Sequence, residues 1–173
     1  MSLITGIANV TAFTECVPAV LQTRAETRRR VYEHNRHRVY SWAFWMTDNE
    51  LAAEELMIAG FCRAFAGTDE PSANDVDCAL ITELRQYISL GSLSLNCTPS
   101  DQVLCVRRNV LRVELERAVV ELPETERLIF LMHDVEGYDH ARISALLNIT
   151  ENESQQAVYQ ARLRIRELLT KAK

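Results

Sequence analysis

Glycine, proline and long apolar runs are scarce in this sequence of 173 residues, and their scarcity already narrows the fold. Five Gly and four Pro leave few points at which a helix would be interrupted, which favours long helices over many short strands. No stretch alternates apolar and polar residues over several successive strands, so we expect an all-α fold. No apolar run approaches the roughly eighteen residues needed to cross a bilayer, and we expect no membrane contact.

Paired cysteines and a basic leader are also missing. The five Cys include no C-x-x-C pair and have no His at zinc-ligand spacing, which favours buried or incidental thiols over a metal site. His34 and His37 could share a metal, but no acid or thiol is placed to complete that site. The N-terminal stretch MSLITGIANVTAFTECV has no basic residues before its apolar ones, which indicates no secretion signal. We therefore expect a cytoplasmic protein without a metal or other cofactor.

Signatures of catalysis are absent as well. The sequence contains no G-x-S-x-G, no P-loop and no H-E-x-x-H, the patterns that position common nucleophiles, phosphates and catalytic zinc. Neighbouring acids such as Glu54 and Glu55 could serve as acid–base groups. At helical positions, without a nucleophile beside them, such acids are typical of solvated faces. We expect that the protein is not an enzyme.

Charge is unevenly distributed along the chain. The net charge of -5 argues against broad, sequence-independent attraction to DNA. Residues 1–38 hold six Arg against three acids, whereas residues 39–110 hold four Arg against ten acids. Residues 111–173 hold nine basic against eleven acidic residues, but within 162–173 five basic residues accompany Glu167 alone. Positive charge therefore gathers in the first stretch and at the C-terminal end.

Two features of the first stretch have alternative interpretations. The arginines between Arg24 and Arg38 could contact DNA or polymerase, but the intervening Glu26 and Glu33 favour an ordinary exposed helix face. The aromatic residues around Trp42 could form a binding platform, although their helical spacing favours a place in the core for Trp42.

Apolar spacing and turn residues indicate how the chain is divided. Helical spacing recurs from about residue 24 to residue 65, with a break expected at residues 47–50. A loop follows at 66–75, and then a further helix at 76–90. The stretch GSLSLNCTPSDQ is typical of a linker. The predicted organisation is a helical domain at 1–90, a linker at 91–107 and a second helical domain at 108–173.

Capping residues in the second domain predict a helix-turn-helix. Asp139 can cap a short helix, and Asn148 supplies the tight turn that follows it. Thr150 and Glu153 form a capping box for the last helix. Two helices joined by a turn of three or four residues, the second presented outward, are typical of a DNA-binding helix-turn-helix.

Two stretches resemble a known family. The first is LPETERLIFLMHDVEGYDHARISALLNITENESQQAVYQARLRIREL, which is similar to the promoter-binding region of bacterial extracytoplasmic-function (ECF) sigma factors. Upstream, RVYSWAFWMTDNELAAEELMIAGFCRAF resembles the polymerase-binding region of the same family, in the family's order. The resemblance implies a sigma-like architecture of regions two and four. It also implies core RNA polymerase and promoter DNA as partners, with an anti-sigma factor as a further candidate.

The resemblance places polymerase binding on the second helix of the first domain. The predicted contact residues are Glu54, Glu55, Ile58 and Phe61. The family carries a Gln and a second acid where this sequence has Ile58 and Ala59. Each missing hydrogen-bond partner in an interface costs about 1–3 kcal/mol. For Phe61, the helical spacing also suits a place in the core.

The same resemblance places promoter contacts on the last helix. The predicted contact residues are Gln155, Gln156, Tyr159, Gln160, Arg162, Arg164 and Arg166. The family commonly has basic residues at the positions of Gln155, Ala157 and Gln160, so this helix binds the DNA backbone with fewer charges. Gln pairs well with adenine in the major groove, which suits base reading. Both roles require that Gln156, Gln160 and Arg162 project into solvent.

Two functions follow from these residues. The first is a working sigma factor, which binds core polymerase and reads an upstream promoter element. The alternative is a diverged sigma-like interaction module that binds an anti-sigma regulator without reading promoters. The substitutions at Ile58 and Ala59 motivate the alternative. The predicted helix at 76–90 does so as well, because the family's DNA-opening segment carries several Arg at this place and this chain carries only one.

Overall fold

The structure, a computed structural model, describes residues 19–105 and 109–171 and contains no strand within them, so the all-α prediction is confirmed. In chain order the helices are α1 (Ala19–Thr47), α2 (Glu50–Gly67), α3 (Ala73–Tyr87), α4 (Asp101–Leu104), α5 (Arg112–Val120), α6 (Glu124–Phe130), the π-helix η1 (Leu131–Val135), α7 (His140–Leu147) and α8 (Glu151–Lys171). Among these described helices, none has the length and apolarity that a membrane crossing requires.

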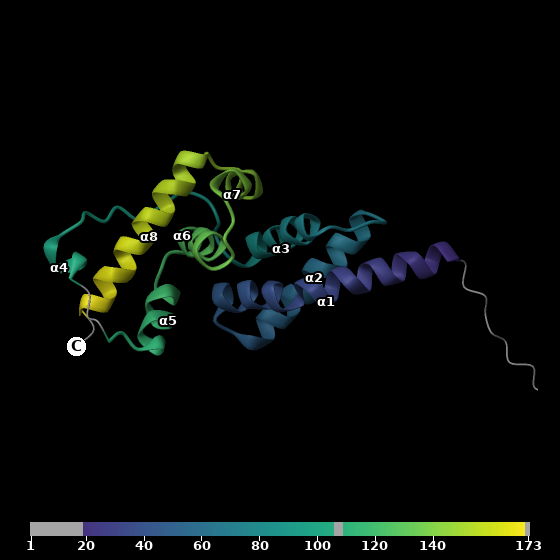
Figure 1. The fold of residues 1–173 in the computed structure, drawn as a ribbon, viewed down its shortest axis with the longest axis horizontal. Coiled ribbons are helices and arrows are strands. Elements are labelled where there is room, and N and C mark those ends of the chain that lie inside the picture. The colour runs from purple at the N-terminus through teal and green to yellow at the C-terminus, as the bar shows by residue number, and fades with distance from the viewer. Residues whose placement is uncertain (1–18, 106–108, 172–173) are drawn as a thin grey trace, which may run out of the picture.

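The first three helices form the N-terminal half (Figure 1). α1 and α2 are packed against each other, and α3 lies against both. The break between α1 and α2 occurs as predicted: Asp48 has a φ of 49°, and the side chain of Asn49 accepts the N–H of Ala52 at 3.0 Å. Asn at this position caps a helix because its oxygen satisfies an N–H that has no partner within the helix.

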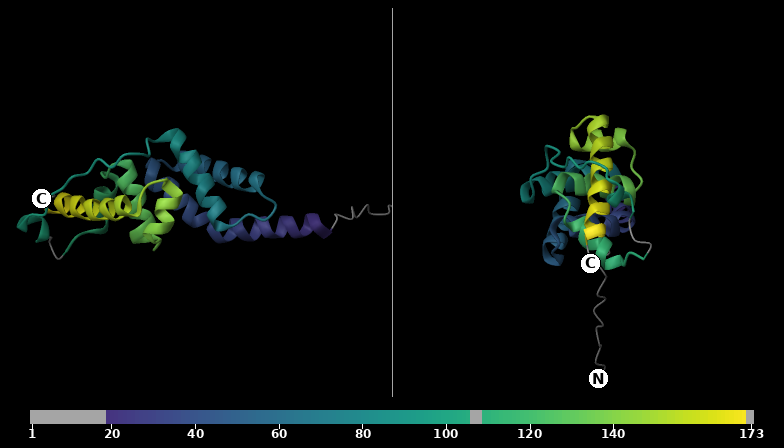
Figure 2. Two further views of the ribbon diagram at one scale, coloured as in Figure 1. Left: turned by 90° about the horizontal axis from the view of Figure 1, so that it is seen from above. Right: turned by 90° about the vertical axis from the view of Figure 1, so that its left-hand side faces the viewer.

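The C-terminal half is built around α8. α4, α5, α6 and α7 all contact this helix, and Figure 2 shows them gathered at the end of the molecule opposite the projecting start of α1. α6 continues directly into η1, whose wider turn buries Leu131 and Met132 while leaving Asp134 beside Arg162 of α8. π-turns of this kind shift the register of a helix and thereby re-aim its side chains.

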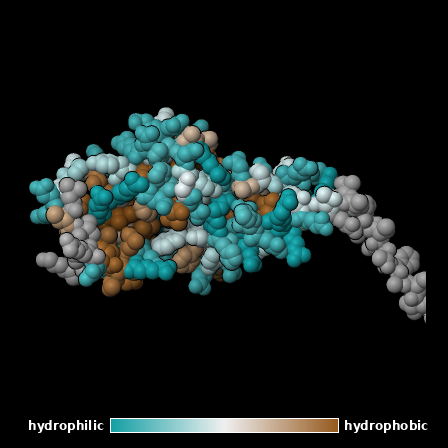
Figure 3. All heavy atoms as spheres, in the orientation of Figure 1, coloured by the Kyte–Doolittle hydropathy of each residue, from teal (hydrophilic) through white to brown (hydrophobic). Residues whose placement is uncertain are grey.

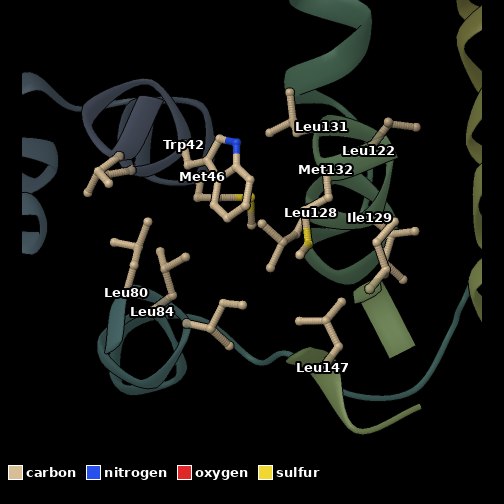
Figure 4. Packing of buried hydrophobic residues seen from close by; sticks show 14 of the residues in the cluster. Trp42, Met46, Leu80, Leu84, Leu122, Leu128, Ile129, Leu131, Met132 and Leu147 are labelled. Carbon is tan, nitrogen blue, oxygen red and sulfur yellow. The ribbon is translucent and has the colours of Figure 1, made fainter. Parts of the chain in front are cut away.

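A single apolar core extends across both halves (Figure 4). Trp42 of α1 and Leu84 of α3 are buried in one cluster with Leu128 and Met132 of the C-terminal half. Polar contacts accompany this packing: Arg127 donates to the backbone oxygen of Trp45 at 3.2 Å, and Arg85 donates to that of Leu147 at 3.0 Å. The two predicted domains therefore pack against each other in this structure, whereas their status as separate domains stays a prediction.

The predicted linker runs along the C-terminal half rather than standing free of it. The N–H groups of Ser94 and Leu95 donate to Oε1 of Glu126 at 2.5 and 2.8 Å. The N–H of Gly91 donates to Oγ1 of Thr125 at 3.0 Å. The Glu126 side chain is only 1% exposed, so this stretch, which we term the connector (residues 89–98), covers a carboxylate that would otherwise be costly to bury.

Candidate nucleic-acid and polymerase interfaces

The predicted helix-turn-helix is formed by α7, the turn at Asn148 and α8. Asp139 caps α7 by accepting the N–H of Arg142 at 2.7 Å, as expected. Asn148 adopts the left-handed conformation, with φ 58° and ψ 50°, a conformation that Asn tolerates better than most residues. The turn predicted from these two residues is confirmed, and it directs α8 away from α7.

The start of α8 carries the predicted capping box. The N–H of Thr150 donates to Oε2 of Glu153 at 2.7 Å, and the N–H of Glu153 donates to the Thr150 hydroxyl at 3.1 Å. The hydrogen bond from the Thr150 backbone lowers the pKa of Glu153 below its usual value. With Glu151 also in the first turn, the helix is stabilised through its dipole, but its beginning presents negative charge to any phosphate.

The outward face of α8 carries most of the predicted base-reading residues. Gln155 and Gln156 are exposed, Tyr159 is 51% exposed and Arg166 is exposed farther along. The spacing of these residues places them on one side of the helix, opposite the buried residues of α8 that face the core. A stripe that consists of two amides, one phenol and one guanidinium is suited to contact bases and phosphates in a groove of DNA.

Gln160 departs from the prediction. It is 8% exposed, and its side-chain oxygen accepts the N–H of Cys97, in the connector, at 2.5 Å. The prediction that Gln160 projects into solvent is therefore wrong for this structure. The physical reason is that the connector passes over α8 at this point and the Gln160 amide satisfies a backbone N–H that lacks another partner.

Two of the three predicted cations of α8, Arg162 and Arg164, are paired with acids of the same chain. Arg162 donates to both oxygens of Asp134 at 2.8 and 2.6 Å, a bidentate geometry. Burial raises the pKa of Asp134, but hydrogen bonds from Arg162 and His133 outweigh it, so the pKa lies below its usual value. Arg164 donates to Glu167 at 2.8 Å. Both arginines are thus partly neutralised before any phosphate approaches.

The predicted polymerase surface lies on the outer face of α2. Glu54 and Glu55 are exposed, Ile58 is 58% exposed, and Leu51, which the sequence analysis did not select, is 66% exposed. Phe61 does not belong to this surface, because it is 4% exposed and its ring lies 4.9 Å from that of Tyr32. Its placement in the contact set is corrected: Phe61 is a core residue.

A second exposed apolar area lies on α5. Leu111, Val113 and Leu115 are 63%, 56% and 43% exposed, and the hydrophobic residues gather over this helix in Figure 3. Val135 of η1 is 60% exposed and lines the adjoining groove together with Leu115. Exposed apolar residues that share a groove, as Leu115 and Val135 do, are typical of surfaces that contact other proteins.

One polar cluster between the halves was missed by the sequence analysis. Asp77 is fully buried and accepts hydrogen bonds from Arg38, Tyr138 and Arg142. The signal lay in the periodicity, since Asp77 stands three and seven residues before Leu80 and Leu84 and so shares their buried face. An acid on the apolar stripe of a helix indicates a buried partner.

No metal centre is found among the described residues, since no three His, Cys, Asp or Glu residues there are grouped as ligands. His133 and His140 are stacked, with ring centroids 4.5 Å apart. His133 lies 2.7 Å from Asp134, and His140 lies 2.9 Å from the Ser154 hydroxyl. These histidines flank the helix-turn-helix and serve its internal hydrogen bonding.

Comparison with known proteins agrees with this geometry. Residues 112–165 match the family described as Sigma-70, region 4. Among solved structures, the chain is similar to the sigma factor RpoE from Bartonella quintana, solved in complex with the anti-sigma factor NepR. The two share 15% identity and a TM-score of 0.58 over 91% of this chain and all of that chain. No curated protein matches this sequence significantly.

These findings define a class. The C-terminal half, from α5 to most of α8, is a region 4 helix-turn-helix of the sigma-70 type. Over 91% of the chain, the fold is similar to that of the sigma factor RpoE, and this likeness includes the N-terminal half that the family match leaves uncovered. The two findings thus combine a region 4 match in the C-terminal half with a sigma-like fold across both halves.

Proposed function

We propose that this chain is an ECF-type sigma factor that binds core RNA polymerase and promoter DNA, and that it acts in the cytoplasm. The observation that carries the proposal is the helix-turn-helix of α7 and α8 with its outward stripe of Gln155, Gln156, Tyr159 and Arg166. In such motifs the second helix enters the major groove, where amide side chains pair with base edges. The remaining predicted contacts, from Gln160, Arg162 and Arg164, require that their present partners give way.

The N-terminal half supplies the polymerase contact in this proposal. The exposed stripe of Leu51, Glu54, Glu55 and Ile58 presents both apolar area and negative charge on one face of α2. Mixed apolar and charged surfaces of this kind are typical of protein interfaces. Because polymerase contributes much of the DNA affinity of the complex, a net charge of -5 is compatible with promoter binding.

The experiment is fluorescence anisotropy with promoter duplexes, with and without core polymerase. Gln156→Ala is expected to lose roughly 1–3 kcal/mol of discrimination between promoter and mismatched sequences, and Arg166→Ala to lower the salt slope by about 0.9. Gln102→Ala, an exposed glutamine of α4 that is not among the predicted DNA contacts, is the matched control. Absence of sequence-dependent binding both with and without polymerase would refute the proposal.

A second function is favoured by the pairing of the α8 cations. A diverged sigma-like module that binds an anti-sigma regulator needs no free arginines, and here Arg162 and Arg164 are already bound to acids. The exposed apolar residues of α5 give such a regulator a surface, and the similar RpoE structure contains the anti-sigma factor NepR. Binding of a regulator that is abolished by Leu115→Asp, together with no promoter binding, would select this function.

A further inference from the structure

Asp77 of α3 joins the two halves of the molecule. Its Oδ1 accepts a hydrogen bond from Arg38 of α1 at 2.5 Å. Its Oδ2 accepts from the Tyr138 hydroxyl at 2.7 Å and from Arg142 of α7 at 2.8 Å. Arg38 belongs to the N-terminal half, whereas Tyr138 and Arg142 belong to the C-terminal half, so one fully buried carboxylate binds donors from both.

The contacts of Tyr138 and Arg142 with Asp77 form only while the two halves are packed against each other, which we term the closed arrangement. Burial, followed by the hydrogen bond to Asp77, raises the pKa of Tyr138 to about 12, so its hydroxyl stays protonated and donates. The Arg142 guanidinium lies 3.7 Å from the centre of the Tyr138 ring. Separation of the halves would leave Asp77 with Arg38 alone, so two of the three donors to this carboxylate depend on the packing of the halves against each other.

Arg142 occupies a position that matters for DNA. It is the only Lys or Arg of α7, the first helix of the helix-turn-helix, which crosses the phosphate backbone in motifs of this kind. Carboxylate and phosphate accept the same charge-assisted hydrogen bonds from a guanidinium. Asp77 therefore provides Arg142 with an acidic partner from within the chain.

We propose that Asp77 is a latch: it holds the helix-turn-helix against α3 by binding Arg142, and opening of the halves releases Arg142 to a DNA phosphate. The release of Arg142 to DNA rests on the proposed function, whereas the holding of the helix-turn-helix against α3 does not. The latch weakens DNA binding because the carboxylate of Asp77 partly neutralises the Arg142 guanidinium and occupies one of its nitrogens, so opening of the halves leaves Arg142 more fully available to a phosphate.

The latch itself is tested by small-angle X-ray scattering on the full chain. Asp77→Asn is expected to increase the radius of gyration, with helix content by circular dichroism retained. The matched control is Glu83→Gln on the same helix: Glu83 is 8% exposed, but its ion pair with Arg63 lies within the N-terminal half. The control is expected to scatter like the unchanged chain.

A second variant keeps this test decisive if Asp77→Asn does not fold. Arg142→Gln removes the partner from the other side, where the side chain is 38% exposed, and the same expansion is expected. A folded Asp77→Asn variant that scatters like the unchanged chain would overturn the latch. If Asp77→Asn does not fold, an Arg142→Gln variant that scatters like the unchanged chain would overturn the latch.

The release of Arg142 is tested by DNA binding at several salt concentrations. Asp77→Asn is expected to bind duplex DNA more tightly, with a salt slope steeper by about 0.9 for one added phosphate contact. The double variant Asp77→Asn/Arg142→Gln is expected to lose both the tighter binding and the steeper salt slope. If Asp77→Asn has a larger radius of gyration but does not bind DNA more tightly, the role of Arg142 is overturned. If it has a larger radius of gyration but no variant binds DNA, even with core polymerase, the proposed function is refuted and the latch remains.

Discussion

The outward faces of α2 and α8 carry the two predicted interfaces, and they use charge in opposite ways. On α2, Glu54 and Glu55 are exposed, and within the described part of the chain neither makes an ion pair. On α8, Arg162 and Arg164 are both held by acids. Glu54 and Glu55 thus present their charges ready for a partner, whereas Arg162 and Arg164 must exchange internal partners for external ones.

This difference has an energetic meaning. A free charge contributes to an encounter from a distance, whereas a paired cation contributes only after its own ion pair is broken. An exposed ion pair is worth about 1 kcal/mol or less, so the exchange at α8 is possible at modest cost. Under the proposed function, this difference leads us to expect that polymerase binding precedes DNA binding. Each prediction below tests one side of the comparison.

The largest expected effect tests whether the two halves share one core. Leu128→Ala removes a fully buried side chain beside the contact between the halves and is expected to lower the free energy of unfolding by about 2–5 kcal/mol. Because Trp42 lies in the same cluster, the urea midpoint from tryptophan fluorescence should fall as well.

The control for that measurement is a buried leucine outside the shared core. Leu163→Ala lies on α8 at 3% exposure but does not belong to the cluster that contains Trp42. It should shift the fluorescence midpoint less than Leu128→Ala does. A fluorescence midpoint that is unchanged in Leu128→Ala would contradict the continuity of the core across the halves.

A smaller effect is expected on the polymerase side. Ile58→Gln combined with Ala59→Glu restores the polar groups that ECF sigma factors carry at these positions. Each hydrogen bond gained in the interface is worth about 0.5–1.5 kcal/mol, so the affinity for core polymerase should rise several-fold or more. Ala66→Glu, exposed near the end of the same helix, controls for added charge, and an unchanged dissociation constant for the double variant would place the interface elsewhere.

The smallest expected effect is a pH dependence on the DNA side. Burial, followed by the charge of His133, lowers the pKa of His140 below 6.5. The unfolded chain then takes up a proton first as the pH falls, so the fold loses stability from about pH 6.5 down to the pKa of His140 in the folded chain.

Urea midpoints at pH 7.5 and 5.5 check this prediction. His140→Asn, which can still contact the Ser154 hydroxyl, should narrow the difference between the two midpoints. His34→Asn on the exposed face of α1 should leave the difference unchanged. A difference that survives in His140→Asn would assign the pH dependence to another group.

Local features of the fold could be predicted from the sequence, because they depend on neighbouring residues. The break at Asn49 and the capping box of Thr150 and Glu153 follow from side chains that hydrogen-bond to nearby backbone. The turn at Asn148 follows from the left-handed conformation that Asn tolerates. The all-α class followed in the same way from spacing and from the scarcity of Gly and Pro.

The features that the sequence analysis missed are long-range. The Gln160 side chain accepts a hydrogen bond from the N–H of Cys97, and Asp77 accepts hydrogen bonds from Tyr138 and Arg142. In each case the two partners are far apart in the sequence. Composition predicted a linker at 91–107, but it did not indicate the helix α4 within that range or the hydrogen bonds from the N–H groups of Ser94 and Leu95 to Glu126. Such pairings depend on how the helices pack, which periodicity alone does not determine.

If Gln160 reads promoter bases, as the proposed function expects, its hydrogen bond to Cys97 makes that contact and connector docking mutually exclusive. Only molecules whose connector has lifted can offer Gln160 to a base, so the measured dissociation constant is the intrinsic one divided by that population. Every 1.4 kcal/mol by which the connector is held weakens the apparent affinity about tenfold. The strength of this promoter contact can thus be adjusted by residues that never touch DNA.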